Sequence, residues 1–488
     1  MRHFGWRHNC VATRTGGLVA GALVLLAGCQ QYERQPLDLA AHRSALHERA
    51  IEVGRIEGFL ERLRGLGVEA PTTFSFEDGL TPAEGEVLAL FYNAKLRQAR
   101  LEAGVALANF ENAGLWDDPE FGFDGAEILS PSGSPFEFGL TLSLTIPISG
   151  RLEVEKARAG AAYEAELRRI VNAEWSTRAD VRRAWASWTV AEERLRLLRE
   201  AIAQIERITV ITDRLEAGGE LSRVEGRLFQ VELADRRAAV AEAQLNATRS
   251  RINLLGLMGL PPDASVVLTP GLPAAHLPVS DDPLRQLIDS NTELAVRRAE
   301  YQIAEEALRL EVRKQYPDIT IGSGYGSEDN DDRLLLGFSV PIPILNANRG
   351  GIAEARAERE ASRASAETTF ERLSRELAVS HADLDAARRQ RSQFESTIVP
   401  MLEQQATEVE QIADLGEVDT LILLETVQRQ FDAKSRLLEL QRVELDASLT
   451  IVELLGPEDS GDPAPVSDDP DENEHTAEDT SSAVGGER

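Results

Sequence analysis

The chain has few of the side chains that build disulfides, metal centres or nucleophilic active sites. It contains 2 cysteines in 488 residues, and Cys10 lies in an N-terminal segment that we expect to be removed. Disulfides are then excluded, and stability has to come from packing. The 7 histidines include no pair at metal-ligand spacing. We therefore expect no catalytic residues, no metal site and no enzymatic activity.

Positive charge is also scarce. The sequence has 52 Lys and Arg against 82 Asp and Glu, a formal net charge of −30. Nucleic-acid binding needs a basic surface, so nucleic acid is excluded as a partner. Part of the acidity is local, because residues 457–488 hold 11 acidic residues and one arginine with almost no large apolar side chains. Such a segment buries too little surface to fold, so we predict an acidic, disordered tail.

The N-terminal apolar run, Gly16–Ala27, follows three arginines and is too short to cross a bilayer core of about 30 Å. This pattern is typical of a signal peptide, which we assign to residues 1–28. The segment ends in Leu26-Ala27-Gly28-Cys29, which resembles a bacterial lipobox and predicts a covalent lipid such as palmitate on Cys29. Ordinary cleavage, with Cys29 incidental, is the alternative. Gln30 follows, and by known sorting rules a residue other than aspartate there favours the outer membrane.

The rest of the sequence contains an internal repeat. Two stretches about 198 residues apart share the same landmarks in the same order, and the offset changes only in expected loops. The matching positions are Asn93 and Asn291, Pro119 and Pro317, Pro147 and Pro341, Ala157 and Ala355, Gly219 and Gly416, and Leu257 and Leu454. The chain is therefore a tandem duplication.

Each unit of the duplication reads as helix, strand, loop, strand, very long helix, turn and helix. An N-terminal lipidated extension, 29–79, comes before the first unit. Repeat 1 covers 80–259, with a β-hairpin at 119–147 and long helices at 151–217 and 220–258. The Pro-rich linker 260–282 leads to repeat 2 at 283–456, with a β-hairpin at 317–342 and long helices at 350–415 and 418–456.

The predicted strands alternate between apolar and polar residues. From Phe136 to Ile146 every second residue is large and apolar, a length that suits a tilted strand crossing a membrane. A half-buried strand of a soluble sandwich is the alternative. Two hairpins supply four strands, and within hydrocarbon an open four-stranded sheet would leave its edges unpaired. Known barrels use at least about eight strands, so several chains must pool theirs.

Proline is missing between Pro147 and Pro261, and this stretch is rich in good helix formers. At about 1.5 Å per residue, a helix from Leu152 to Leu215 would approach 100 Å. Apolar residues recur along it at heptad spacing, which requires lengthwise packing on other helices. The seam residues are Val181, Ala184, Trp188, Ala191, Leu195, Leu198, Ile202 and Ile205 in this helix, and Leu424, Phe431, Leu438, Leu445 and Val452 in the last one.

The ordered set of features resembles the TolC-type outer-membrane efflux family over roughly Leu80 to Gly456. The resemblance rests on Leu80-Thr81-Pro82-Ala83-Glu84, the proline-led strands, the Ile146-Pro147-Ile148 exit and the Ala217–Ser222 turn. It implies a mainly α protein with membrane β-strands that forms, as a homotrimer, a 12-stranded β-barrel and a periplasmic α-helical barrel. It also implies a passive conduit from periplasm to exterior that works with a periplasmic adaptor protein and an inner-membrane pump, in contact with outer-membrane lipid.

The resemblance assigns roles to the turns at the far ends of the long helices. Adaptor docking is expected at the tips formed by Gly218, Gly219, Leu221, Ser222, Gly416 and Val418. Carboxylates near the tips would form rings around the pore under threefold symmetry and attract cations. The candidates for this constriction are Glu220, Glu225, Glu417, Asp419 and Glu425. The alternative is that they are solvated carboxylates favoured by helix dipoles.

Two other protein classes share some of these features. A periplasmic adaptor also has a long helical hairpin, but it would lack the duplicated strand-helix unit. A structural coiled-coil lipoprotein of the envelope would lack the alternating strands. The transported substrate stays open between drugs, heavy-metal ions and secreted polypeptides.

Overall fold

The computed structural model describes residues 32–49, 51–65, 70–72, 74–75, 78–127, 136–275, 277, 281–328, 331–414 and 420–457. The chain divides into two compact units, residues 1–49 and 50–488. In the first unit, helix α2 (Leu39–His47) is capped by Asp38, which accepts a hydrogen bond from the Ala41 backbone N–H at 2.9 Å. The signal peptide, Cys29 and the tail beyond residue 457 lie outside the described residues.

The larger unit begins with short helices that build its main core. These are α3 (Val53–Gly65), α4 (Pro82–Tyr92) and α5 (Ala94–Glu111). Ile56 and Phe59 of α3 are fully buried against α4, so the extension before residue 80 contributes to the core. The carboxylate of Glu86 in α4 accepts hydrogen bonds from Arg178 at 2.9 Å and Arg182 at 2.5 Å. This buried pairing fixes α4 on the following long helix.

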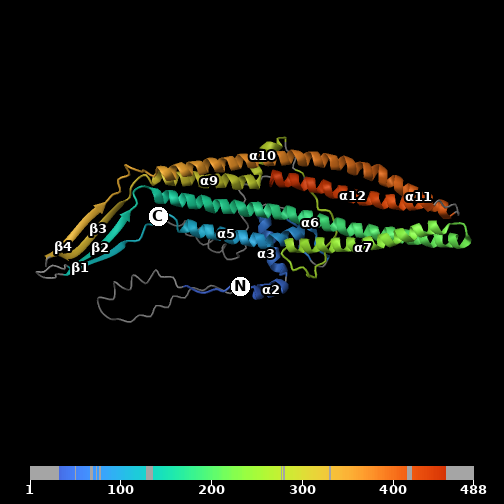
Figure 1. The fold of residues 1–488 in the computed structure, drawn as a ribbon, viewed down its shortest axis with the longest axis horizontal. Helices are drawn as coiled ribbons and strands as arrows, with labels where there is room; N and C mark the ends of the chain where they lie inside the picture. The colour runs from blue at the N-terminus through green and yellow to red at the C-terminus, as the bar shows by residue number, and fades with distance from the viewer. Residues whose placement is uncertain are drawn as a thin grey trace, which may run out of the picture. The chain divides into compact units, whose positions relative to one another are not determined.

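The two hairpins join into one antiparallel sheet (Figure 1). Its strands are β1 (Glu120–Glu127), β2 (Phe136–Ile146), β3 (Ile319–Glu328) and β4 (Asp331–Ser339), in the order β1-β2-β3-β4. The centre of the sheet is therefore a junction between the two repeats, where Leu140 lies opposite Tyr325. Strands β1 and β4 form its two edges.

The register gives the sheet two chemically different faces. Paired residues point to the same side of a sheet, so the register groups large apolar residues on one side, the apolar face. They are Phe121, Phe123, Phe138, Leu140, Leu142, Leu144, Ile146, Ile319, Ile321, Tyr325, Leu334, Leu336 and Phe338. Two carboxylates, Glu127 and Asp332, also lie on this side, at the end of the sheet far from the helices. Leu336 and Phe338 are 79% and 80% exposed, so within one chain the apolar face is uncovered.

The opposite side, the polar face, carries glycines, small hydroxyl side chains and charges. Its charged side chains with a described environment are Glu120, Asp124, Glu137, Asp331 and Arg333. Leu335 is the large apolar exception on this side. Among residues whose side-chain environment is described, the polar face therefore has four carboxylates and one guanidinium per chain.

Helix α6 (Arg151–Gly218) runs for 68 residues and contacts α5 and α7 (Arg223–Leu257), which belong to the same repeat. It also contacts α9 (Thr292–Arg313) and α12 (Thr420–Leu455) from the second repeat (Figure 1). Trp185 of α6 is fully buried, and its indole N–H donates to the Thr269 carbonyl at 3.2 Å. The linker after residue 260 is thus packed on α6.

Each repeat has two helices before its first strand, where one was expected from the sequence. Asn93 ends α4 and caps α5, and its side-chain amide donates to the Leu257 carbonyl at 2.8 Å. Asn291 does the same between α8 (Pro283–Ser290) and α9, donating to the Leu454 carbonyl at 2.8 Å. In both repeats, this hydrogen bond therefore joins the start of the repeat to the end of its last helix.

The expected continuous helix 350–415 is interrupted. It consists of α10 (Arg349–Gln393), a π-helical turn η1 (Phe394–Ile398) and α11 (Val399–Asp414). Pro400 lacks an N–H to donate within the helix and its ring crowds the preceding turn, so the backbone widens just before it. Among the helices of the described residues, none is long and apolar enough to cross a membrane.

Two residues before α10 adopt a backbone conformation that L-residues avoid. Ala347 has φ 46° and Asn348 has φ 51°, at the place where repeat 1 has Gly150 with φ 70°. Asn348 is held by side-chain hydrogen bonds to the Glu311 carbonyl at 2.9 Å and its carboxylate at 2.7 Å.

We expect Ala347→Gly to stabilise the protein by about 1 kcal/mol, because glycine removes the strain of a positive φ. Thermal unfolding followed by helical circular dichroism measures this effect. The matched control is Gly337→Ala, at a position with open space and no positive φ, where little change is expected. A midpoint for Ala347→Gly at or below that of the unchanged chain would contradict the strain.

Candidate functional site

The first helix tip lies between α6 and α7 and is shaped by Gly219. This residue has φ 75°, and its N–H donates to the Glu216 carbonyl at 3.0 Å. The next N–H, of Glu220, returns to the Leu215 carbonyl at 2.9 Å. A residue in this conformation ends a helix by satisfying its last carbonyls, and glycine adopts it without strain. Gly218 and Gly219 are both exposed, so the tip presents bare backbone to a partner.

Ser222 and Glu225 start the second helix of this tip. The Ser222 hydroxyl and N–H donate to the Glu225 carboxylate at 2.7 and 3.0 Å, and the Glu225 N–H donates to the Ser222 hydroxyl oxygen at 3.3 Å. This reciprocal arrangement is a capping box. Glu225, expected at the constriction, therefore has a structural role at the start of α7, and the Ser-x-x-Glu spacing is the sequence signal for it.

The other carboxylates near the tips differ in their surroundings. Glu220 is exposed at the turn itself. Glu425 lies on α12 and pairs with Arg429 one turn further on, at 2.5 Å, with more than half of each side chain exposed. The second turn lies outside the described residues, and with it Gly416, Glu417, Val418 and Asp419. Helix α11 ends at Asp414 before this turn and α12 begins at Thr420 after it.

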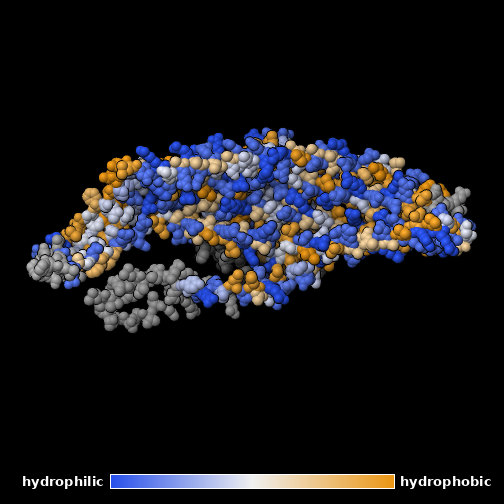
Figure 2. Space-filling view, in the orientation of Figure 1, coloured by the Kyte–Doolittle hydropathy of each residue, from blue (hydrophilic) through white to orange (hydrophobic). Residues whose placement is uncertain are grey.

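The tips also expose apolar side chains whose role was not predicted from the sequence. Val224 is 72% exposed beside the first turn, and Leu421 is 62% exposed at the start of α12. Leu221, which was expected to dock a partner, is half-buried. Figure 2 shows hydrophobic residues at this end of the helices and again where β4 leads into α10. Exposed apolar side chains at both ends of the helices are typical of contact surfaces.

The opposite ends of the long helices meet the sheet at a charged junction. Arg151, the first residue of α6, donates to Asp318 at 2.8 Å, Asp117 at 2.7 Å and Glu155 at 3.1 Å. The Ser149 backbone N–H also donates to Asp318. Burial disfavours the charged carboxylate, but the hydrogen bonds from Arg151 and Ser149 outweigh it and lower the pKa of Asp318. The junction joins the start of α6 in repeat 1 to the start of β3 in repeat 2.

We expect Asp318→Asn to cost about 1–3 kcal/mol near pH 7, because it removes a charged acceptor from Arg151. The folded pKa of Asp318 lies below its unfolded value of about 3.9. Its contribution is therefore fully present above pH ~4 and is lost as the pH falls through the folded pKa. Unfolding measured between pH 2 and 7 tests this, and the difference between variant and unchanged chain should shrink at the acid end. Asp117→Asn is the control, since 62% of the Asp117 side chain is exposed. Equal losses in both variants at every pH would contradict the assignment.

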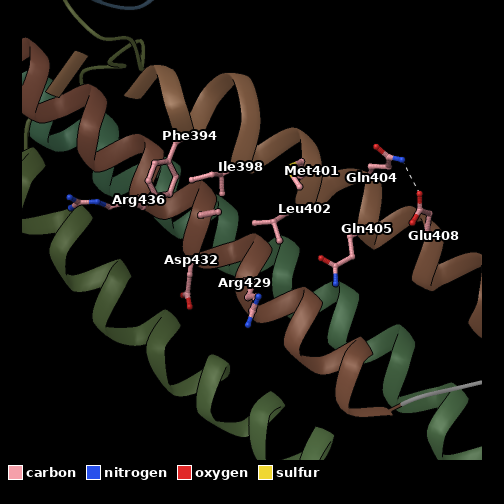
Figure 3. Close-up of a pocket in the computed structure, with 11 residues that line it drawn as sticks. Phe394, Ile398, Met401, Leu402, Gln404, Gln405, Glu408, Arg429, Asp432 and Arg436 are labelled. Carbon is pink, nitrogen blue, oxygen red and sulfur yellow. Dashed lines mark hydrogen bonds between the residues drawn. The ribbon is translucent and has the colours of Figure 1, made fainter. Parts of the chain in front are cut away.

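One pocket of about 760 Å³ lies beside the π-turn, between α11 and α12 (Figure 3). Ile398 and Leu402 point from the η1 and α11 side toward α12, and Arg429, Asp432 and Arg436 contribute charges from α12. Its four charged lining residues, Glu408, Asp432, Arg429 and Arg436, balance to zero. The lining has no nucleophile paired with a base. In the described part of the chain, no three His, Cys, Asp or Glu side chains are placed to hold a metal ion.

The two repeats match a known family. Residues 87–260 and 284–457 each match the profile of the outer membrane efflux proteins, so the chain belongs to that family. It is an outer-membrane efflux channel of the tripartite type with a periplasmic helical part, and it is not an enzyme. Channels of this family are trimers that work with adaptors and pumps.

The chain is similar to a cobalt-zinc-cadmium resistance protein, CzcC of Cupriavidus metallidurans, with 24% identity over 319 residues, covering 64% of this chain and 76% of the relative. Among solved structures, the Campylobacter jejuni CmeC outer membrane channel superposes with a TM-score of 0.67 at 15% identity, over 85% of this chain and 93% of that one. The open state of the Neisseria gonorrhoeae MtrE channel gives 0.65 at 16%, over 80% and 96%. These structures share the fold, which confirms the fold class expected from the sequence.

Proposed function

We propose that three copies of this chain form a lipid-anchored outer-membrane duct that exports divalent metal cations. The sheet supports an assembly of several copies, and the family supports the number three. Its edge strands β1 and β4 leave one row of backbone groups each without a partner within the sheet. In hydrocarbon each backbone N–H or C=O without a hydrogen bond costs several kcal/mol. The sheet can therefore enter a membrane only when the edge strands of neighbouring copies pair with each other. Three copies give the twelve strands of the family's trimeric barrel.

The helices support the same closure. Helix α7 buries one heptad seam, including Phe229, Ala243 and Leu254, and carries a second seam that is exposed throughout. The exposed seam consists of Val231, Ala234, Ala238, Ala241, Leu245, Thr248 and Ile252. On α10, small exposed residues follow the same spacing at Ala357, Ala361, Ala364 and Thr368, and again at Ala378 and Ala382, with Glu371 and Arg375 at the positions between. A helix with an exposed apolar seam is expected to pack that seam against a helix of another copy. Small side chains allow the two helix backbones to approach closely. Helix α7 of one copy then packs on α10 of the next.

The helix tips are the adaptor surface in this proposal. Gly218, Gly219, Leu221 and Ser222 form the first tip, with Gly416 and Val418 at the second. Val224 and Leu421 extend the contact with exposed apolar side chains. Glu220, Glu417, Asp419 and Glu425 remain the constriction candidates. Glu225 is set apart from them because its carboxylate caps α7.

Cys29 supplies the lipid anchor that holds each copy in the outer membrane. Radiolabelled palmitate tests this assignment directly: we expect label in the unchanged chain and none in Cys29→Ser. Because the strands are the main membrane contact in the proposal, Cys29→Ser should retain most of its export. Equal labelling of both chains would contradict lipidation at Cys29.

The cargo assignment rests on one observation, the charge of the polar face. The described charged side chains of this face are Glu120, Asp124, Glu137, Asp331 and Arg333. In three copies they place twelve carboxylates and three guanidinium groups around the barrel interior. Rings of carboxylates attract cations and repel anions. The similarity to a protein of cobalt, zinc and cadmium resistance favours divalent metals among the cations.

A susceptibility panel on a deletion strain tests the cargo. We expect the strain to become more sensitive to zinc, cobalt or cadmium salts, and to recover with the unchanged chain. A variant with Asp124→Asn, Glu137→Gln and Asp331→Asn should recover less metal resistance, whereas Thr141→Ala on the same face should recover fully. Unchanged metal tolerance together with new sensitivity to organic drugs would contradict the assignment.

A further inference from the structure

The contact between the two repeats within one chain indicates how two neighbouring copies would contact each other. Within one chain the end of repeat 1 pairs with the start of repeat 2, through β2 and β3 and through Arg151 and Asp318. In a closed ring of copies, the end of repeat 2 must meet the start of repeat 1 of the next copy. Since the two repeats have the same fold, the second junction should copy the geometry of the first. This step rests on the proposed homotrimer.

The equivalences between the repeats come from the sequence landmarks. Pro119 corresponds to Pro317, so β1 residues lie 198 positions before their β3 equivalents. Pro147 corresponds to Pro341, so β4 residues lie 194 positions after their β2 equivalents. After the strands the offset returns to 198, which makes Arg349 the equivalent of Arg151.

We propose that β4 pairs antiparallel with β1 of the next copy in the register that places Gly337 opposite Asp124, and that Arg349 binds Glu120 of that copy. The register is transferred from Ser143 opposite Gly322 in the β2–β3 pair. The ion pair is transferred from Arg151 and Asp318. The partner is thus a second copy of this chain in one defined alignment.

The faces of the sheet agree with this register. It puts Phe338 opposite Phe123 of the next copy, as Leu144 lies opposite Ile321 within the chain. All four residues belong to the apolar face. A slip by one residue would turn the apolar side chains of β4 against the polar face of β1. The apolar and polar faces therefore continue without a break across the copy junction.

The charges agree as well. The proposed contact between copies pairs Arg349 with Glu120, and the equivalent contact within one chain pairs Arg151 with Asp318. Within the described residues, neither Arg349 nor Glu120 makes an ion pair in its own chain, and both are exposed. Arg349 is the first residue of α10, as Arg151 is of α6. Its bond to Glu120 would fasten the root of one helix to the first strand of the next copy.

Disulfide trapping tests the register. Within one chain, a Cβ built on Gly322 lies 4.0 Å from the Ser143 Cβ, which suits a disulfide. Ser143→Cys with Gly322→Cys is therefore the internal control, and it should oxidise without linking chains. Gly337→Cys with Asp124→Cys is the equivalent pair between copies. We expect it to give covalent dimers and trimers on non-reducing gels.

A register control uses the same side of the strand. Gly337→Cys with Ala126→Cys is shifted by two residues and should give at least about fivefold less cross-linked product, because opposite Cα atoms beyond ~7 Å cannot be bridged. Single-cysteine variants control for Cys29. Stronger linking of the shifted pair would overturn the register while leaving the trimer intact. No linking of the 337 and 124 pair in a particle of trimeric mass overturns the register alone, and a monomeric particle overturns the trimer as well.

Charge reversal tests the ion pair. Arg349→Glu and Glu120→Arg should each lower the fraction of trimer that survives mild detergent by about fivefold, and the double variant should restore it to within about twofold. Arg151→Glu is the matched control, because Glu120→Arg should not rescue it. Helical circular dichroism verifies that each variant is folded. Single reversals without effect, or a double variant no better than the singles, would overturn the pairing.

Discussion

Leu336→Arg is expected to prevent stable insertion into the outer membrane. Leu336 is 79% exposed on the apolar face of β4 and lies opposite Ser323. An arginine on the lipid side of a barrel strand costs about 2–4 kcal/mol near the bilayer midplane, and a trimer would carry that cost three times. Fractionation followed by immunodetection measures the result: the variant should be depleted from outer membranes, and export should fall to that of the deletion strain.

The neighbouring residue provides the control for this variant. Leu335 is 57% exposed but points to the polar face, opposite Gly324. In the closed barrel its side chain faces the aqueous interior, so Leu335→Arg should insert at close to the normal level. It should still lower metal export, since it adds three positive charges to a cation path. Equal membrane levels for the two variants would contradict the assignment of the faces.

Gly219→Pro is expected to abolish export while leaving the trimer assembled. Gly219 has φ 75°, whereas proline is held near −65°. Proline also removes the N–H that donates to the Glu216 carbonyl. The turn between α6 and α7 therefore cannot keep its shape, and the adaptor surface is lost. Gly416→Pro should act in the same way at the second turn.

The tip prediction separates docking from folding. Gly219→Ala keeps the N–H and should cost only about 1–2 kcal/mol, so it should retain part of the export. Co-purification with the adaptor, together with the mass of the detergent particle, gives the readout. We expect Gly219→Pro to lose the adaptor and keep its trimeric mass. Normal export in both proline variants would rule out the tips as the docking surface.

The fold class was predictable because its strongest signals are periodic. Alternation from Phe136 to Ile146 predicts the strand, and the structure gives β2 those same limits. The long helices follow from heptads in a stretch without proline, and most of the seam residues, such as Val181, Trp188 and Leu195, are buried. A periodic pattern rests on many residues, so a single deviating residue does not change the predicted helix or strand.

Features that depend on single residues were harder to predict. Pro400 was visible in the sequence, yet the π-turn before it arises from how the helix accommodates a missing donor within a packed layer. Trp185, outside the predicted seam, is fully buried because α6 packs on α4 and the linker as well as on long helices. These contacts join distant parts of the chain, and periodicity within one helix does not contain them.

Some features of the candidate site were predictable from the sequence and others were not. The glycine turn at the first tip could be recognised, because Gly219 has the positive φ that such a reversal requires. Two local contacts of these carboxylates were not predicted: the capping box of Glu225 with Ser222, and the ion pair of Glu425 with Arg429 one turn away. Both are short-range patterns that a sequence does contain. Which carboxylates face the pore depends on neighbouring copies, and a single sequence does not specify their positions.

The most direct test of the account is an electron-microscopy reconstruction of the purified chain in detergent or lipid nanodiscs. We expect a threefold particle in which twelve strands close a barrel and helices of about 100 Å extend from it as a hollow cylinder. Density for β4 should run beside β1 of the next copy, and α7 beside α10. A monomer, or an assembly in which β1 and β4 stay unpaired within the membrane, would contradict it.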